Sequence, residues 1–110
     1  MAITTSYTRP EPERSAIDRL SGPAVIEFGT SWCGYCMAAQ PLLAQAFGDH
    51  PGVNHIKVED GKGQALGRSF RVTLWPTLVF MRDGRELARL VRPTDAAAIS
   101  QALAGLGPVD

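Results

Sequence analysis

Cys33 and Cys36 are the only cysteines of this chain, and two residues separate them in the segment Trp32-Cys33-Gly34-Tyr35-Cys36. The pair follows a short apolar run, residues 24–28, that has the length and composition of a buried strand, and it precedes a pattern typical of a helix. A chain with this feature places two thiols at a strand-to-helix junction, near enough to bond to each other. The simplest interpretation is a dithiol that cycles between a reduced and a disulfide form.

The length of the chain, 110 residues, fits one domain over residues 1–110 that buries a hydrophobic core without disulfide or metal cross-links. The two cysteines are therefore free for chemistry. The charges balance, with 11 Lys and Arg against 11 Asp and Glu, which argues against a nucleic-acid partner. No run approaches the roughly 20 apolar residues of a membrane span, and the first part of the chain has no signal-peptide core. We expect a cytoplasmic protein, in which a disulfide is transient and catalytic.

The rest of the sequence predicts alternating strands and helices. Apolar runs predict strands over 24–28, 53–58 and 77–81, and an edge strand over 2–8 for which a frayed terminus is the alternative. Helical patterns cover 12–20, 33–47, 64–70 and 94–106, with Pro41 inside the second and Thr94 as the cap of the last. Asp83-Gly84 is a hairpin signal, so Thr77–Arg82 and Arg85–Val91 should pair antiparallel. This order predicts an α/β domain, a central mixed sheet flanked by helices.

Cys33 should stand at or just before the first helical position, where free backbone amides and the helix dipole favour negative charge on its sulfur. The thiolate is the form that attacks a disulfide, so Cys33 is the candidate nucleophile. Cys36 lies almost one turn further along on nearly the same face and is the candidate resolving thiol. The alternative is that both cysteines act only as small buried hydrophobic residues.

Glu27 is unusual because it lies within a run that is otherwise suited to burial. A buried carboxylate is costly unless it is paired, protonated or reached by solvent. In such a place Glu27 would accept and return the Cys36 proton, through water, as a mixed disulfide resolves. His55 or Lys57 on the next predicted strand is the candidate partner, and we favour His55. The alternative is a Glu27 that faces solvent at a strand end.

Two further patterns have more than one interpretation. Trp75-Pro76-Thr77 introduces a strand, and the Trp75–Pro76 bond is a candidate cis peptide, although a simple strand-entry proline is the common alternative. Cys33, Cys36, His50 and His55 have the spacing of a two-Cys, two-His zinc finger. That finger needs both histidines on one helix, and Pro51-Gly52 between them breaks any helix. We therefore expect no metal and no cofactor.

The sequence resembles the thioredoxin family from about residue 12 to residue 106. The landmarks are Glu27-Phe28 before the first cysteine, the Trp32–Cys36 segment, Pro41 in the following helix, Trp75-Pro76-Thr77, and the Asp83-Gly84 hairpin. By this resemblance Cys33 attacks, Cys36 resolves, Pro76 is a cis-proline that faces the dithiol, and Glu27 replaces a buried aspartate. The resemblance also implies a substrate segment that lies extended beside Trp75. The substrate-docking residues would be Trp32, Gly34, Tyr35, Trp75, Pro76 and Arg92.

Four residues depart from the family pattern. Tyr35 replaces a proline, Glu27 is longer than the usual aspartate, Trp75 replaces an aliphatic residue, and Arg92 replaces a glycine. Tyr35 restores an amide N–H that proline lacks and that would help stabilise a thiolate. Since a stabilised reduced form makes the couple more oxidising, we expect Tyr35→Pro to lower the reduction potential.

These observations together predict a thiol–disulfide oxidoreductase that reduces protein disulfides through Cys33, Cys36 and Glu27. The resemblance implies regeneration by a thioredoxin reductase, with glutathione as the fallback electron donor, and we expect a monomer. The alternatives are a more oxidising thiol oxidase or isomerase, and a redox-sensing binding module. Such a module would dock a partner or hold an iron–sulfur cluster with a second copy and glutathione.

Overall fold

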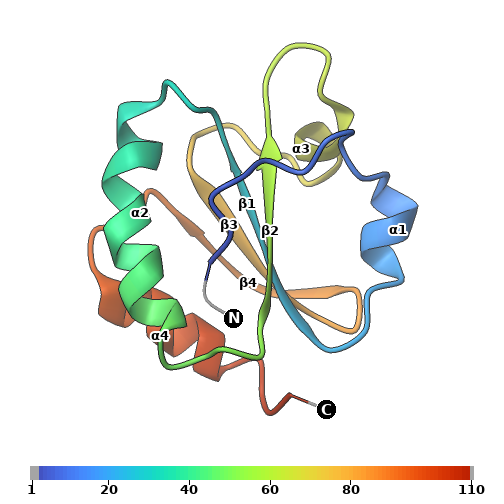
Figure 1. Ribbon diagram of the computed structural model, residues 1–110. Coiled ribbons are helices and arrows are strands. Elements are labelled where there is room, and N and C mark those ends of the chain that lie inside the picture. Colours follow the sequence, from blue (N-terminus) through green and yellow to red (C-terminus); the bar gives the residue numbers. More distant parts are fainter. Residues whose placement is uncertain (1–2, 110) are drawn as a thin grey trace.

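Strand β1 (Pro23–Gly29) is an inner strand of the sheet, and every one of its residues is buried. It pairs in parallel with β2 (Asn54–Glu59) and antiparallel with β3 (Thr77–Arg82), and β3 pairs antiparallel with β4 (Arg85–Val91). The structure is a computed structural model that describes residues 3–109. The strand order β2-β1-β3-β4 makes the predicted mixed sheet (Figure 1). The nearly continuous apolar run of β1 suits a strand that is covered on both faces.

Helices cover both faces of this sheet (Figure 1). Helices α2 (Gly34–Phe47) and α4 (Ala96–Ala104) lie on one face, and α1 (Arg14–Asp18) and α3 (Ala65–Ser69) lie on the other. Successive β1 side chains point to opposite faces. Val25 accordingly packs in the cluster under α2 and α4, and Ile26 packs in the cluster under α1 and α3. The same alternation places Glu27 on the α2 side.

The β3–β4 hairpin has the turn that its sequence predicts. Asp83 and Gly84 have φ values of 51° and 79°, the left-handed conformation that the tight hairpin turn requires. The Asp83 Oδ1 atom accepts a hydrogen bond of 2.8 Å from the Gly22 amide, which joins the turn to the segment before β1. The expected antiparallel pairing of Thr77–Arg82 with Arg85–Val91 is confirmed.

Three expectations about secondary structure were wrong: one strand, the length of one helix and the cap of another. Ile3–Thr8 forms no regular strand, although the Thr8 amide donates to the Lys57 carbonyl of β2 at 2.7 Å; Ala2, the first residue of that expectation, lies outside the described residues. The helix expected over 12–20 is confined to α1. The cap of α4 is Asp95 and not Thr94, because Asp95 Oδ1 accepts the Ala98 amide at 2.8 Å.

No helix within residues 3–109 is both long and apolar enough to cross a membrane.

Candidate functional site

The dithiol lies where the chain leaves β1 and enters α2. Cys33 is the N-cap residue of α2, and its Sγ atom accepts a hydrogen bond of 3.2 Å from the Cys36 amide. The amides of a first helical turn have no partner within the helix, so a sulfur at the cap position satisfies one of them. This contact stabilises negative charge on Cys33 Sγ. The expected position of Cys33, just before the helix, is confirmed.

Both thiols are largely covered, with 7% of Cys33 and 3% of Cys36 exposed. Burial, as the largest cause, and a hydrogen bond to Cys33 raise the pKa of Cys36 to about 12. A weaker contact from the Thr30 backbone acts in the opposite direction. Cys36 therefore keeps its proton near neutral pH, while Cys33 has a donor directed at its sulfur. The two thiols occupy chemically different environments, although they are close in sequence.

Gly29, the last residue of β1, provides the space for the buried sulfur. A Cβ atom at this position would lie 2.6 Å from Cys36 Sγ. Any larger residue would therefore displace the sulfur or the start of α2. Gly29 was not among the candidate site residues, and its position directly after the predicted buried strand over 24–28 was the available signal.

Glu27 is buried beneath α2, with 1% of the residue exposed. Its Oε1 atom lies 2.9 Å from His55 Nε2, its Oε2 atom accepts a 2.8 Å hydrogen bond from Gln40 Nε2, and Lys57 Nζ lies 3.9 Å from Oε2. The choice of His55 as the direct partner is confirmed, and the solvent-facing alternative was wrong. In this arrangement both carboxylate oxygens have donors.

The partners of His55 and Gln40 fix where the protons lie. The Thr4 amide donates to His55 Nδ1 at 2.9 Å, so the ring proton is on Nε2 and faces Glu27. Lys57 Nζ donates to Gln40 Oε1 at 3.1 Å, so the NH₂ group of Gln40 faces Glu27 and the Cys36 carbonyl. His55 and Gln40 therefore both donate hydrogen bonds to the Glu27 carboxylate.

A small cleft of about 190 Å³ leads from solvent to Cys36. Its lining includes Thr30, Gln40 and Lys57 as well as Tyr7 of the N-terminal segment. Thr30 Oγ1 is buried and, among the described residues, has no hydrogen-bond partner. Burial is also the main reason why the pKa of Tyr7 is raised above its ordinary value, so Tyr7 remains a neutral phenol. The cleft gives water access to Cys36 and to the polar side chains beside Glu27.

The residues expected to dock substrate gather around Cys33. The Trp75 carbonyl lies 3.9 Å from Cys33 Sγ, and the Trp75–Pro76 peptide bond is cis. The rings of Trp32 and Trp75 meet edge to face, with centroids 5.6 Å apart. The Arg92 guanidinium lies over the Tyr35 ring at 4.0 Å, and Gly34 is exposed at the first position of α2.

The Tyr35 amide does not have the contact expected of it. Within residues 3–109, the hydrogen bond to Cys33 Sγ comes from the Cys36 amide, and Tyr35 instead contacts Arg92 through its ring. A cap side chain can accept the second or the third amide of a helix, here that of Tyr35 or Cys36, and Cys33 Sγ accepts the third.

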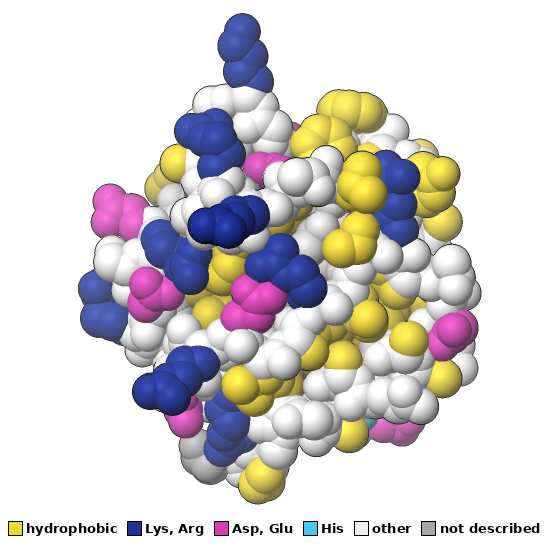
Figure 2. Space-filling view, turned by 180° about the vertical axis from the view of Figure 1, so that it is seen from behind, with side chains coloured by type: hydrophobic (Ala, Val, Ile, Leu, Met, Phe, Trp, Pro, Cys, Tyr) yellow, Lys and Arg dark blue, Asp and Glu magenta, His cyan; other side chains and the backbone are white. Residues whose placement is uncertain are grey.

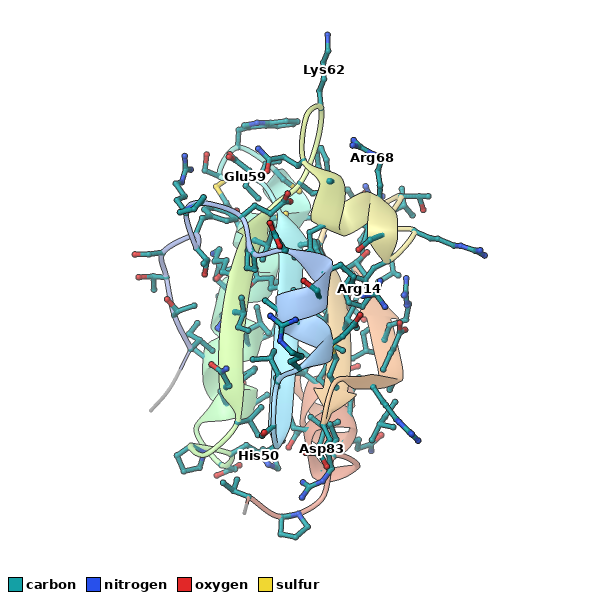
Figure 3. All side chains as sticks on the ribbon, turned by 90° about the vertical axis from the view of Figure 1, so that its right-hand side faces the viewer. Arg14, His50, Glu59, Lys62, Arg68 and Asp83 are labelled. Atoms are coloured by element: carbon teal, nitrogen blue, oxygen red, sulfur yellow. The ribbon has the colours of Figure 1, made fainter. Side chains whose placement is uncertain are left out.

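Of the residues with zinc-finger spacing, the cysteines and His50 lie far apart. Cys33 stands before α2 and His50 follows its end, and this 14-residue helix has a length of about 20 Å. His50 contacts Ser100 Oγ, and Figure 3 shows it at the end of the molecule opposite Lys62. In the part of the chain that the structure describes, no three His, Cys, Asp or Glu side chains are grouped as metal ligands.

Sequence reasoning missed four residues of the site: Thr4, Gly29, Thr30 and Gln40. Gln40 has the clearest role, because it links Glu27, Lys57 and the Cys36 carbonyl. Its spacing of four residues from Cys36, on one face of the predicted helix, was a usable signal.

The comparisons with known proteins are consistent with this geometry. A family model described as Thioredoxin matches residues 7–105. The structure of reduced thioredoxin 2 from Pseudomonas aeruginosa PAO1 is 58% identical, covers 94% of this chain and 96% of that chain, and superposes with a TM-score of 0.84. A thioredoxin of Mycolicibacterium smegmatis is 33% identical over 86 residues, 76% of this chain and 77% of that protein.

Other curated relatives match over a shorter part of their length. Thioredoxin H-type 1 of Nicotiana tabacum is 36% identical over 67 residues, 61% of this chain and 53% of that protein. The chain thus spans about half the length of such curated relatives. A structure titled for the thiol resolving mechanism of yeast mitochondrial 1-Cys peroxiredoxin via glutathione/thioredoxin systems is 25% identical. It covers 93% of this chain and 97% of that chain, with a TM-score of 0.78.

Proposed function

The chain belongs to the thioredoxin family, and from this premise we propose that it is a thiol–disulfide oxidoreductase that reduces protein disulfides. The observation that carries the proposal is the difference between the two thiols. Cys33 Sγ accepts a helix amide, whereas Cys36 is buried behind it with a pKa of about 12. One sulfur is prepared to attack, and the other holds its proton until it is needed.

The reaction follows from these two environments. The Cys33 thiolate attacks one sulfur of a substrate disulfide, forms a mixed disulfide and releases the first substrate thiolate. Cys36 then loses its proton and attacks Cys33 Sγ, which releases the second substrate thiolate. A Cys33–Cys36 disulfide forms as two electrons pass to the substrate, whose two thiolates are protonated from solvent. A two-electron donor must then restore the dithiol.

Glu27 is the proposed acceptor of the Cys36 proton. Its carboxylate has donors from His55 and Gln40, and Gln40 also contacts the Cys36 carbonyl. The cleft at Cys36 supplies the water through which the proton would move. Glu27→Gln should therefore slow the resolution of the mixed disulfide more than its formation.

The surface around Cys33 is the proposed docking site for an extended substrate segment. Trp32 is 71% exposed and Tyr35 is 58% exposed, which is unusual for large aromatic side chains. Together with Gly34, Trp75, Pro76 and Arg92 they surround the attacking sulfur. The substrates of this proposal are proteins with accessible disulfides, and peroxiredoxin-type disulfides are one class to test, given the relative titled for that system.

Regeneration is assigned to a thioredoxin reductase, with glutathione as the fallback donor. We place the reaction in the cytoplasm, where thiols are kept reduced, and the protein acts as a monomer. Incubation of the oxidised protein with each donor, followed by a count of free thiols, tests this assignment. A dithiol restored by neither donor would contradict it.

An insulin-reduction assay tests the function. The protein should accelerate insulin reduction, Cys33→Ser should abolish the activity, and Cys36→Ser should accumulate mixed disulfides with its substrates. Activity that persists in Cys33→Ser would contradict the proposal. A Cys36→Ser protein that forms no adducts would contradict the resolving role of Cys36.

A more oxidising thiol oxidase or isomerase is the second candidate function. The hydrogen bond to Cys33 Sγ stabilises the reduced form and so raises the potential. Equilibration against a glutathione series separates the two candidates. A potential close to that of protein disulfide isomerase, about −180 mV, would favour the oxidase or isomerase.

A further inference from the structure

Arg92 is held in place at the edge of the docking surface by three contacts. Its amide donates to the Pro76 carbonyl at 2.9 Å, its Nε atom donates to the Trp75 carbonyl at 2.9 Å, and its guanidinium lies 4.0 Å from the centre of the Tyr35 ring. Side chain and backbone are therefore both fixed, and little rotamer freedom remains to be lost when a substrate binds.

The backbone at Arg92 is also unusual. Its φ of 50° lies in the left-handed region, where a residue with a Cβ atom is disfavoured. Glycine would adopt this conformation at no cost. A long charged side chain at a position suited to glycine suggests that the side chain itself has a task.

The Nη1 and Nη2 atoms of Arg92 are the groups available for that task. Among residues 3–109 no hydrogen bond or ion pair involves them, because the contact with Trp75 uses only Nε. They are near the reacting sulfur, since the Trp75 carbonyl that binds Arg92 Nε also lies 3.9 Å from Cys33 Sγ. Figure 2 shows hydrophobic side chains gathered at the upper right, the end of the molecule where α2 begins.

The acidic residue of this region does not neutralise Arg92. Asp60 accepts the Trp75 indole N–H at 2.8 Å, at the opposite end of that residue from its carbonyl. No ion pair joins Arg92 to a carboxylate in the part of the chain that the structure describes. The guanidinium therefore presents a positive charge and two unpaired NH₂ groups to an incoming substrate.

We propose that Arg92 selects protein disulfides with an Asp or Glu side chain next to the cysteine that Cys33 attacks. This inference rests on the proposed reductase function and adds the substrate class. The two NH₂ groups lie in one plane and match the two oxygens of a carboxylate, whereas an amide side chain offers a single acceptor and no charge. The half-buried position of Arg92 reduces screening by water and salt.

Two peptides provide the test. Each has one intramolecular disulfide, and the two differ only in a Glu or a Gln beside the first cysteine. The measured quantity is the second-order rate constant for oxidation of the reduced protein by each peptide, followed by thiol alkylation and mass spectrometry. The wild type should prefer the Glu peptide by about fivefold, the value of a single ion pair near a surface, and the preference should shrink at high salt.

Variants assign this preference to Arg92. Arg92→Gln should react with both peptides at equal rates, whatever its overall rate. Arg85→Gln is the matched control and should keep the full preference, because Arg85 is an exposed arginine at the start of β4, whereas Arg92 directly follows the end of that strand. If Arg92→Gln does not fold, Arg92→Lys serves instead and should show a reduced preference, since charge is kept and planarity is lost.

Several outcomes would overturn the inference. Equal rates of the wild type with both peptides would do so, and so would a preference that survives in Arg92→Gln. An Arg92→Gly variant that reacts faster than the wild type with both peptides, by the same factor, would also do so. The guanidinium would then only shield the Trp75 carbonyl. The wild type could instead show no preference for the Glu peptide but react with glutathione disulfide faster than Arg92→Gln does. Arg92 would then bind the carboxylates of a small disulfide, and the proposed protein substrate class would be wrong. A wild type that reacts with neither peptide would overturn the proposed function as well.

Discussion

Glu27 illustrates how far single residues can be interpreted from sequence. A carboxylate inside an apolar run indicated burial, and burial indicated a partner, which led to His55. Gln40 and Thr4 could not be found in this way. Gln40 is a polar residue in a predicted helix, where polar side chains usually face solvent. Thr4 donates through its backbone amide, a group that every residue except proline has. These contacts depend on how distant segments pack, and no local pattern records that.

The raised pKa of Cys36 has a consequence for stability. An ordinary thiol with a pKa of 9.0 ionises in the unfolded chain, whereas folded Cys36 keeps its proton up to a pH of about 12. The folded state therefore binds more protons than the unfolded state between these values, and the contribution of Cys36 to stability is full below pH 9.0 and lost as the pH rises toward 12.

Urea unfolding of the reduced protein between about pH 8 and 11 measures this effect. The free energy of unfolding of the wild type should fall with pH more steeply than that of Cys36→Ala, which has no thiol to titrate there. Parallel curves for the two proteins would show that Cys36 titrates normally in the folded state.

Among the elements, strands and the hairpin were easier to predict than helix ends. The buried run of β1 and the Asp83-Gly84 turn depend on local chemistry that the sequence displays directly. The cap of α4 does not, because Thr94 and Asp95 are both good capping residues and adjacent. Only the backbone conformation decides between them, and it places the Asp95 carboxylate, not the Thr94 hydroxyl, on the Ala98 amide.

Alanine substitutions test the assignment of this cap. Asp95→Ala should lower the free energy of unfolding by about 1 kcal/mol, since it removes the acceptor of the Ala98 amide. Thr94→Ala is the matched control and should change stability by less than about half of that amount. Denaturant unfolding followed by circular dichroism measures both, and a larger loss in Thr94→Ala would refute the assignment.

The hairpin turn allows a second test at the level of elements. Gly84 has a φ of 79°, and an added Cβ atom would collide with the Asp18 carbonyl oxygen, whereas Gly63 has a φ of 82° and open space around it. Gly63→Ala should cost about 1 kcal/mol from the left-handed conformation alone. Gly84→Ala should cost at least about 2 kcal/mol more, because the turn must separate from the α1 segment. Equal melting temperatures for the two variants would show that the turn yields without cost.

At the scale of the whole molecule, the N-terminal segment joins the outer edge of the sheet to the candidate site around Glu27. Ile3–Thr8 runs beside β2, contacts the Lys57 carbonyl through Thr8, and reaches His55 through the Thr4 amide. An edge strand was expected in this segment from its composition alone. The segment lies at the edge of the sheet, but its hydrogen bonds to β2 are too few for a regular strand. The bond from the Thr4 amide goes to the His55 side chain instead of the backbone.

Proline substitutions test this connection. Thr4→Pro removes the amide that donates to His55 Nδ1 and should cost about 1 kcal/mol of stability. Thr5→Pro is the control, since the Thr5 amide has no partner among the described residues. Nitrogen chemical shifts of the His55 ring should show the neutral Nε2–H form in the wild type and in Thr5→Pro. A wild-type ring protonated on Nδ1 would contradict the proton assignment around Glu27.

The edge-to-face pair beside Cys33 includes every tryptophan of the protein, because Trp32 and Trp75 are its only two. All indole emission therefore comes from residues next to the dithiol, since Trp32 directly precedes Cys33 and the Trp75 carbonyl lies 3.9 Å from Cys33 Sγ. A disulfide quenches nearby excited indoles, so fluorescence should dim on oxidation and recover on reduction. Intrinsic tryptophan fluorescence should therefore report the redox state of the dithiol in real time, without any added label.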